Sequence, residues 1–147
     1  MKRLMLCAAV LLFCAASPVW GADTIKVGEI ATVTGDFAAY GIAEVESVKI
    51  AVDEINAAGG VLGRKLEVVM YDCRTRQEDM VNAARRLVEQ DKVVAAIGPS
   101  GSGLCIAAAP VFNRGRVSHL GTLPTNPLVT VDEAGKVRNL ADRKSVV

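Results

Sequence analysis

Aromatic side chains, histidine and net charge are all scarce in this chain. Phe, Trp and Tyr make up 4% of the 147 residues, one residue is histidine, and the formal net charge is +1 at pH 7. A nucleic-acid-binding surface needs aromatic side chains for base stacking or a basic stripe for the phosphates, and the sequence has neither. The length allows one ordinary domain at most, and an apolar fraction of 51% is enough for its core.

Motifs for catalysis and for metal binding are also missing. No pair of His, Cys or carboxylate residues has the spacing of a metal site. The glycine-rich segment 98–103 lacks the Gly-Lys-Ser/Thr of a P-loop, the G-x-G-x-x-G fingerprint and the G-x-S-x-G elbow. We therefore expect no enzyme activity, no metal and no cofactor. A hydrolase that uses Ser102 and His119 is the weakest alternative, because a single histidine in or beside a strand is more often structural than catalytic.

The first 22 residues have the pattern of a cleaved secretory signal peptide. A short cationic start precedes the apolar run Leu4–Ala16, which is too short to span a bilayer comfortably. Pro18 breaks this run, and the small residues Gly21 and Ala22 follow. We expect cleavage after Gly21 or Ala22 and a periplasmic location for the mature chain.

Strand-like and helix-like segments alternate in the rest of the chain. The predicted helices have apolar residues on one face, as in Val48, Ala51, Val52 and Ile55. The predicted strands cover residues 25–30, 66–71, 93–97 and 117–120, and the predicted helices cover residues 40–57, 75–87 and 104–113. This alternation predicts a three-layer α/β fold, with a mostly parallel sheet and helices on both faces.

Each predicted strand is followed by a loop rich in Gly, Ser and Thr. The loops cover residues 32–41, 72–77, 98–103 and 121–130. Because the carboxyl ends of parallel strands meet at one edge of the sheet, and ligands bind there, the sequence predicts a lobe that binds a small molecule.

Several residues of these loops are candidate ligand contacts. A carboxylate can dock at the start of the helix near residue 103, with hydroxyl help from Ser100 or Ser102. Tyr40 offers a ring wall and a hydroxyl, and Thr125 offers a hydroxyl in a loop stiffened by two prolines. The alternatives are that Ser102 only caps the helix, that Tyr40 packs at a helix start, and that the fourth loop is an ordinary proline turn.

Two cysteines, Cys73 and Cys105, remain after the predicted cleavage. An exported protein can form a disulfide, and both residues are expected at the same edge of the sheet. Two separate buried thiols that act as small apolar side chains are an equal alternative.

An ordered set of motifs resembles a known family. The motifs are Thr34–Gly35, Tyr40–Gly41, Glu54–Arg64, Ile97–Pro99 and Pro124–Pro127. Together they resemble the amino-terminal lobe of type I periplasmic solute-binding proteins, and most of all the branched-chain amino-acid (Leu/Ile/Val) group of ABC importers. The resemblance covers residues 24–138.

This resemblance implies two α/β lobes, joined by a hinge, that close on an amino acid. It aligns Ser102 with a carboxylate-binding serine, Thr125 with a ligand-contacting threonine and Tyr40 with an aromatic pocket residue. At the position of Leu123 the family contacts the ligand through main-chain atoms. The expected ligand-binding residues are Tyr40, Ser100, Gly101, Ser102, Leu123 and Thr125.

The resemblance also implies the partners of the protein. These are an amino acid, whose ammonium is bound by an acid of the second lobe, and an ABC permease in the inner membrane. A full-length protein of this kind is expected to be monomeric and to perform no chemistry. The alternative is the ligand-sensing ectodomain of a receptor with the same fold.

The carboxyl end departs from the family pattern at Asn139. The last six residues, 142–147, are a translation of GATCGGAAGAGCGTCGTG, a stretch of a widely used sequencing adapter whose next triplet, TAG, is a stop. We therefore expect a signal peptide over residues 1–22, an incomplete amino-terminal lobe over residues 23–138, and an aberrant tail over residues 139–147 that arose in sequencing or assembly. A true short protein with a basic tail is the alternative.

Overall fold

The computed structural model describes residues 24–137 and 141–143. The predicted alternation of strands and helices is confirmed, with boundaries shifted by a few residues. The strands are β1 (Ile25–Ala31), β2 (Leu66–Asp72), β3 (Ala95–Ile97), β4 (Ser118–Gly121) and β5 (Ala141–Arg143). The helices are α2 (Ala38–Ala57), α3 (Gln77–Arg86), which continues as a π-helical turn over Leu87–Asp91, α4 (Ser102–Gly115), and a short 3₁₀ turn over Pro127–Val129.

The strands form one parallel sheet in the order β2-β1-β3-β4-β5. β1 lies between β2 and β3, so the chain first builds the sheet on one side of β1 and then on the other. The loops that follow β1 and β3 therefore diverge at their carboxyl ends. Such a switch point is where open α/β sheets bind their ligands.

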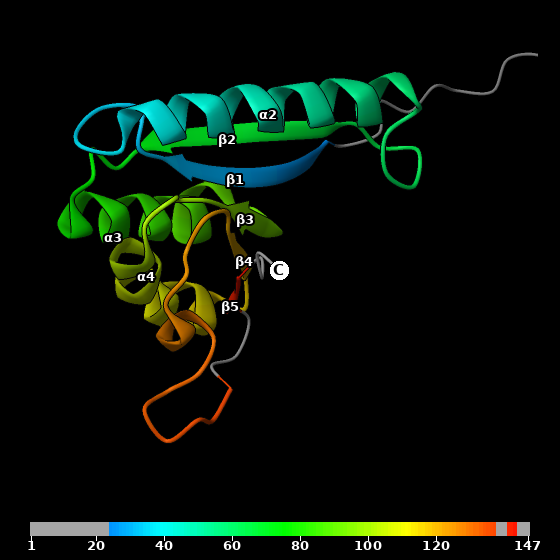
Figure 1. Ribbon diagram of the computed structural model, residues 1–147. Helices are drawn as coiled ribbons and strands as arrows, with labels where there is room; N and C mark the ends of the chain where they lie inside the picture. The colour runs from blue at the N-terminus through cyan, green and yellow to red at the C-terminus, as the bar shows by residue number, and fades with distance from the viewer. Residues whose placement is uncertain (1–23, 138–140, 144–147) are drawn as a thin grey trace, which may run out of the picture.

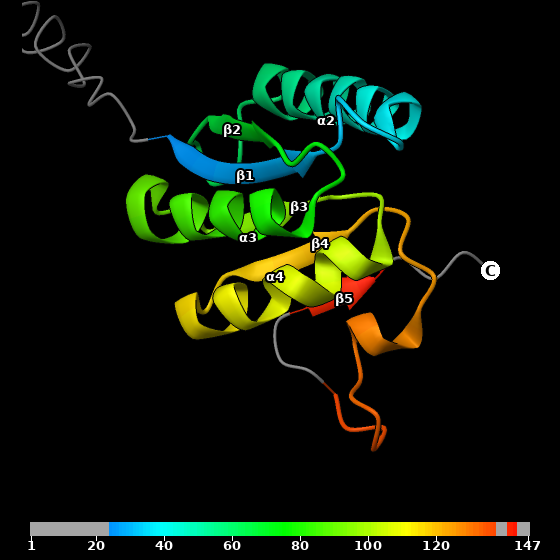
Figure 2. The same cartoon turned by 90° about the vertical axis from the view of Figure 1, so that its left-hand side faces the viewer.

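Helices cover both faces of the sheet, as the sequence predicts. α2 lies along one face over β1 and β2, whereas α3 and α4 lie side by side on the other face (Figures 1 and 2). The expected three-layer α/β architecture is therefore confirmed.

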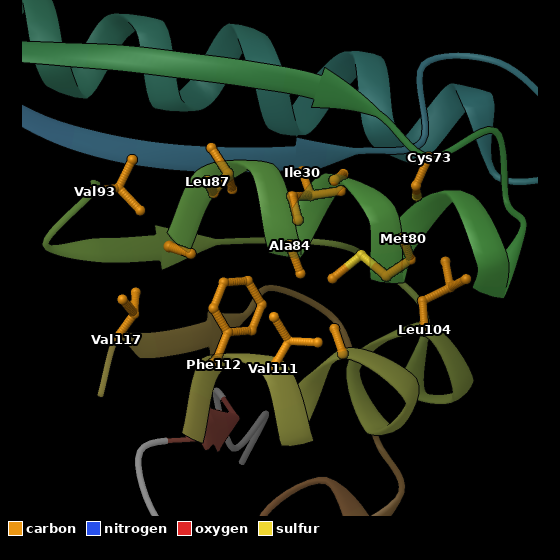
Figure 3. Close-up of a cluster of buried hydrophobic side chains, with 13 residues drawn as sticks. Ile30, Cys73, Met80, Ala84, Leu87, Val93, Leu104, Val111, Phe112 and Val117 are labelled. Carbon is orange, nitrogen blue, oxygen red and sulfur yellow. The ribbon is translucent and has the colours of Figure 1, made fainter. Parts of the chain in front are cut away.

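The main core lies between the sheet and the pair α3 and α4. Ile30 of β1 packs there with Met80, Leu87 and Phe112, all of them fully buried (Figure 3). The apolar face predicted for the second helix, which includes Ala84 as well, is buried throughout. The spacing of apolar residues at the helical period of 3.6 identifies this face correctly, because the sheet packs on one side of α3 and α4 packs on another.

The apolar face predicted for the first helix is only partly correct. Ala51 is exposed and Ile55 is 38% exposed, while the buried residues of α2 are Gly41 and Glu44. α2 packs against a single layer of two strands, so it buries a narrower stripe than a helix with neighbours on both sides. Its Ile50 is exposed for the same reason.

The sheet has a bare area beside α2. A hollow of about 570 Å³ lies over β3 and β4, lined by Val27, Ala95, Ala96, Ile97, Ser118, His119 and Leu120. Leu120 is 42% exposed. Since parallel sheets are normally covered on both faces, the described residues make up an incomplete lobe.

The predicted signal peptide, residues 1–22, lies outside the described residues. Three residues of the predicted tail are described: Ala141–Arg143 form β5, paired in parallel with β4 from His119 to Gly121. The segment that departs from the family pattern thus continues the sheet for three residues, and the origin of the tail stays a prediction.

Candidate functional site

A pocket lies at the carboxyl edge of the sheet, at the switch point between β1 and β3. Its volume is about 570 Å³. It is formed by the first turns of α2 and by the loops after β3 and β4, and its lining residues are Ala39, Tyr40, Ala43, Glu44, Ser47, Val48, Ser100, Thr122 and Leu123. A smaller hollow of about 240 Å³ shares Tyr40, Ser100 and Leu123 with it and adds Phe37.

Two glycines allow the backbone segments around this pocket to approach each other. A Cβ on Gly41 would clash with the carbonyl oxygen of Thr32, so only glycine lets α2 begin against the loop after β1. Gly98 has a φ of +84°, and a Cβ there would clash with Glu44 Oε1 and with the carbonyl oxygen of Ile30. The loop after β3 is thereby held directly against the carboxylate of Glu44.

Glu44 ties together the three segments that form the pocket. Ser100 Oγ and Thr122 Oγ1 both donate hydrogen bonds to Glu44 Oε2, each at 2.8 Å. The residue is 8% exposed, and its Oε1 is buried without a hydrogen-bond partner among the described residues. Burial raises the pKa of Glu44, and the two hydroxyl donors oppose that rise.

A second buried carboxyl group, Glu29 on β1, lies near Glu44. It is 2% exposed, and it also lines a hollow of about 390 Å³ between α2 and the strands β1 and β2. Burial, and after it the negative charge of Glu44, raise the pKa of Glu29 to about 7. The α2 side of the sheet therefore holds two interacting carboxyl groups, and Glu44 lines the pocket.

Ser102 and Thr125 meet at the same edge, next to the pocket. The main-chain N–H groups of Thr125 and Asn126 donate to Ser102 Oγ at 3.2 and 3.3 Å. The helix N-cap is Gly101, and no side chain caps it, so the alternative that Ser102 is merely the N-cap is wrong. The oxygen of Ser102 is used as an acceptor, and within residues 24–137 no acceptor takes its hydroxyl proton.

The structure brings the six expected binding residues to one edge of the sheet, in two groups. Tyr40, Ser100 and Leu123 line the pocket, and Tyr40 is 57% exposed with its ring centroid 6.3 Å from that of Phe37. Ser102 and Thr125 lie two residues further along the same two loops, with Gly101 buried between the serines. Ligand contact by these six residues stays a prediction.

Sequence reasoning missed Glu44 and Thr122. Glu44 stands four residues before Val48, so it continues the apolar face of the predicted helix. A carboxylate on an apolar helix face is the signal that could have identified it. Thr122 had no comparable signal, because it is one of several hydroxyl residues in its loop.

His119 has a structural environment. It is buried, its Nε2 donates to the carbonyl oxygen of Gly98, and its ring stacks on Phe112 with centroids 4.5 Å apart. Burial lowers its pKa, which favours the neutral form of the ring. These contacts give no support to the hydrolase alternative with Ser102, since the ring is engaged elsewhere.

Cys73 and Cys105 are both free and fully buried. Burial raises the pKa of Cys73 to about 11 and that of Cys105 to about 12. Of the two alternatives drawn from the sequence, the structure has two separate thiols, which pack as small apolar side chains.

The described part of the chain has neither a cluster of metal ligands nor a long apolar helix. Residues 24–137 and 141–143 contain no group of three or more His, Cys, Asp or Glu side chains that could hold a metal ion. No helix in these ranges combines the length and the apolarity needed to cross a bilayer.

Known proteins with similar sequences are binding proteins. The chain is 33% identical over 125 residues to an "Amino acid binding protein" of Pseudomonas aeruginosa, a match that covers 82% of this chain and 33% of the relative. It is 34% identical over 131 residues to the "Leu/Ile/Val-binding protein BraC3" of Rhizobium johnstonii, covering 89% of this chain and 34% of that protein. The chain thus spans about one third of the length of these curated relatives.

Solved structures with the same fold include binding proteins for branched-chain amino acids. The branched-chain amino-acid transporter substrate-binding protein LivJ of Streptococcus pneumoniae, solved in complex with isoleucine, superposes with a TM-score of 0.72 at 38% identity, covering 74% of this chain and 31% of that one. The leucine-binding protein LivK of Thermotoga maritima also superposes with a TM-score of 0.72, at 32% identity. This match covers 82% of this chain and 32% of the LivK chain.

The family comparison covers nearly all of the described residues. The sequence profile described as "Periplasmic binding protein" matches residues 24–139. The matched span contains the whole pocket, both of its loops and the switch point between β1 and β3. This chain belongs to the type I periplasmic binding protein family, and it represents part of one lobe.

Proposed function

We propose that this chain is the amino-terminal ligand-binding lobe of the periplasmic substrate-binding component of an ABC importer for branched-chain or related amino acids. The observation that carries the proposal is a pocket at the switch point of the sheet, in a chain whose relatives are named as Leu/Ile/Val-binding proteins. The apolar side of the pocket, with Ala43, Val48 and Leu123, suits an aliphatic side chain.

The ligand carboxylate is proposed to bind at Ser102 and Thr125. The hydroxyl proton of Ser102 has no acceptor among the described residues, and the N-terminus of α4 provides main-chain N–H groups and the positive end of the helix dipole. Thr125 is held beside Ser102 by its own N–H, so its exposed hydroxyl is available to the same ligand.

Further parts of the proposal concern the complete protein. A second lobe closes over the bound amino acid, and the closed form is recognised by a permease in the inner membrane. Residues 1–22 direct export to the periplasm and are then removed. The protein acts as a monomer and performs no catalysis.

We also propose that residues 24–147 do not function alone. The bare area over β3 and β4, with the exposed Leu120, is a surface that a complete lobe is expected to cover. A purified fragment is therefore expected to unfold without a cooperative transition and to show no thermal shift with leucine. A sharp melt that leucine moves upward would contradict this part of the proposal.

The test of the function is a thermal-shift screen of the complete gene product against leucine, isoleucine, valine, polar amino acids, small amides and urea. A ligand at 100 times its Kd is expected to stabilise the protein by about 2.7 kcal/mol. Stabilisation by aliphatic amino acids, followed by calorimetric titration, would support the proposal. Stabilisation by an amide or by urea alone would refute it.

A further inference from the structure

A second hollow lies beneath α2 and shares only Val48 with the pocket. Its volume is about 390 Å³, and all of its lining residues fall between Glu29 and Met70, on α2, β1 and β2. The described residues therefore form it completely. Most of its wall is apolar: Val45, Val48, Val52, Leu66, Val68 and Met70. An apolar cavity of about 150 Å³ is enough to hold benzene, so this hollow has room for a small organic molecule.

Three of the four polar side chains around this hollow are already engaged. Lys49 Nζ and Asp53 Oδ2 form an ion pair at 3.3 Å, with the two side chains 68% and 67% exposed. The amide group of Asn56 donates to the carbonyl oxygen of Leu66 at 3.0 Å and accepts the N–H of Leu66 at 2.7 Å. The fourth side chain is Glu29, whose Oε1 is buried without a hydrogen-bond partner among the described residues. Glu29 is thus the polar group of the hollow that is left to recognise a ligand.

The surroundings of Glu29 favour a positively charged partner. The charged groups of α2 around it are Glu44, Lys49 and Asp53, and its neighbours in the sheet are the apolar Met70 and Ile97. Lys49, the cation among the lining residues, is held by Asp53 on the exposed side of the helix. Glu29 is 2% exposed, so its removal from water is already a cost of the fold. A cation that enters the hollow gains the attraction of the carboxylate without adding to that cost.

We propose that the hollow beneath α2 binds a small apolar primary amine, whose ammonium group pairs with the Glu29 carboxylate and whose hydrocarbon part packs against the valines of α2. This site is independent of the proposed function, because it lies under the helix and not at the carboxyl edge of the sheet. A neutral molecule of the same shape lacks the charge, and an anion is repelled by the carboxylate. The site should therefore select amines.

Proton binding by Glu29 determines how the affinity should depend on pH. Burial, and after it the charge of Glu44, raise the pKa of Glu29 to about 7, whereas an alkylammonium group stays charged well above pH 8. The carboxyl group is then about one tenth ionised at pH 6 and about nine tenths ionised at pH 8. Since the amine pairs with the ionised form, its affinity should rise about tenfold between these two pH values.

The test is a calorimetric titration of the complete gene product with benzylamine and with benzyl alcohol, which has the same skeleton without the positive charge. At pH 8 we expect benzylamine to bind at least tenfold more tightly than benzyl alcohol, and its affinity to fall about tenfold at pH 6. Glu29→Gln should weaken benzylamine binding at least tenfold at pH 8. Glu54→Gln, which removes a charge at an exposed position of the same helix, should leave it unchanged.

Val52→Phe tests the location of the amine, because Val52 lines the hollow but not the pocket. The larger side chain fills the hollow and should exclude benzylamine. Absence of benzylamine binding, equal affinities for the two probes, an affinity that does not change with pH, or unchanged binding in either hollow variant would each overturn the inference. The comparisons on the wild-type protein decide even if a variant does not fold. The proposed function stands in all these cases, and it fails instead if the wild-type protein binds no amino acid.

Discussion

The main-chain N–H of Thr125 donates to Ser102 Oγ at 3.2 Å, which joins the loop after β4 to the first turn of α4. The two residues are 23 positions apart in the chain, and this bond brings them together at the edge of the sheet. The same bond leaves the proton of Ser102 free for an anionic group.

Ser102→Ala is therefore expected to weaken leucine binding about tenfold or more, because it removes a donor to a charged carboxylate. The free energy of unfolding should fall by less than about 1 kcal/mol, since the N–H groups of Thr125 and Asn126 are on exposed residues and can bond to water. Calorimetric titration and urea unfolding measure the two effects. Ser118→Ala, in β4 and outside the residues that line the pocket, is the control. Unchanged affinity in Ser102→Ala would exclude the carboxylate contact.

Gly98→Ala should destabilise the protein by about 2–4 kcal/mol, because its Cβ would clash with Glu44 Oε1 and with the carbonyl oxygen of Ile30. Gly135→Ala is a matched control: Gly135 also has a positive φ, +78°, but a Cβ there would meet no atom within 4 Å beyond its chain neighbours. That control should cost about 1 kcal/mol from backbone strain alone. Urea unfolding curves of both variants measure their free energies of unfolding. Equal losses of stability in the two variants would argue against the close contact at Gly98.

The stability of the wild-type protein should fall with rising pH because of Glu29, and Glu29→Gln should remove this pH dependence. The folded-state pKa of Glu29 is raised from 4.5 to about 7, so the folded protein binds its proton more tightly than the unfolded chain does. Wild-type stability should then fall as the pH rises from about 4.5 to about 7, and level off above. Glutamine cannot ionise, so the variant should match the wild type near pH 4 and exceed it near pH 8 by at most about 3 kcal/mol. Thermal unfolding across this pH range measures the difference, and a difference that is independent of pH would contradict the assignment.

Phe112→Ala should lower the free energy of unfolding by about 3–5 kcal/mol, because the ring is fully buried between α3, α4 and the sheet. Ile50→Ala, on the exposed side of α2, should cost less than about 0.5 kcal/mol. Chemical denaturation of both variants provides the comparison. Similar losses at the two positions would mean that the cluster around Phe112 is not the stabilising core of the complete protein.

Local patterns in the sequence were enough to locate β1 to β4 and the helices α2, α3 and α4, but they did not predict β5 or the 3₁₀ turn. The helical period of Met80, Ala83, Ala84 and Leu87 predicted a face that is buried as expected. The same reasoning was less successful for α2, where Ala51 is exposed. Periodicity reports which residues share a face, but the width of the buried stripe depends on how many elements pack around the helix.

The candidate site was predicted in part. The sequence placed Tyr40, Ser100 and Leu123 in loops at one edge, and the structure has them around one pocket. It did not identify Glu44, whose importance comes from hydroxyl groups 56 and 78 positions away in the chain. Hydrogen bonds over such separations leave no local pattern.

By itself, the amino-acid sequence determined the α/β alternation, the polar loops at the carboxyl ends of the strands and the family to which the chain belongs. These properties depend on the spacing of apolar residues and on short motifs, which are local. Only the tertiary structure decided that β1 lies between β2 and β3, that Ser100 and Thr122 donate to Glu44, and that Ser102 keeps its proton. Strand order and long-range hydrogen bonds arise when distant segments pack together, and so the polarity of the pocket is a property of the fold.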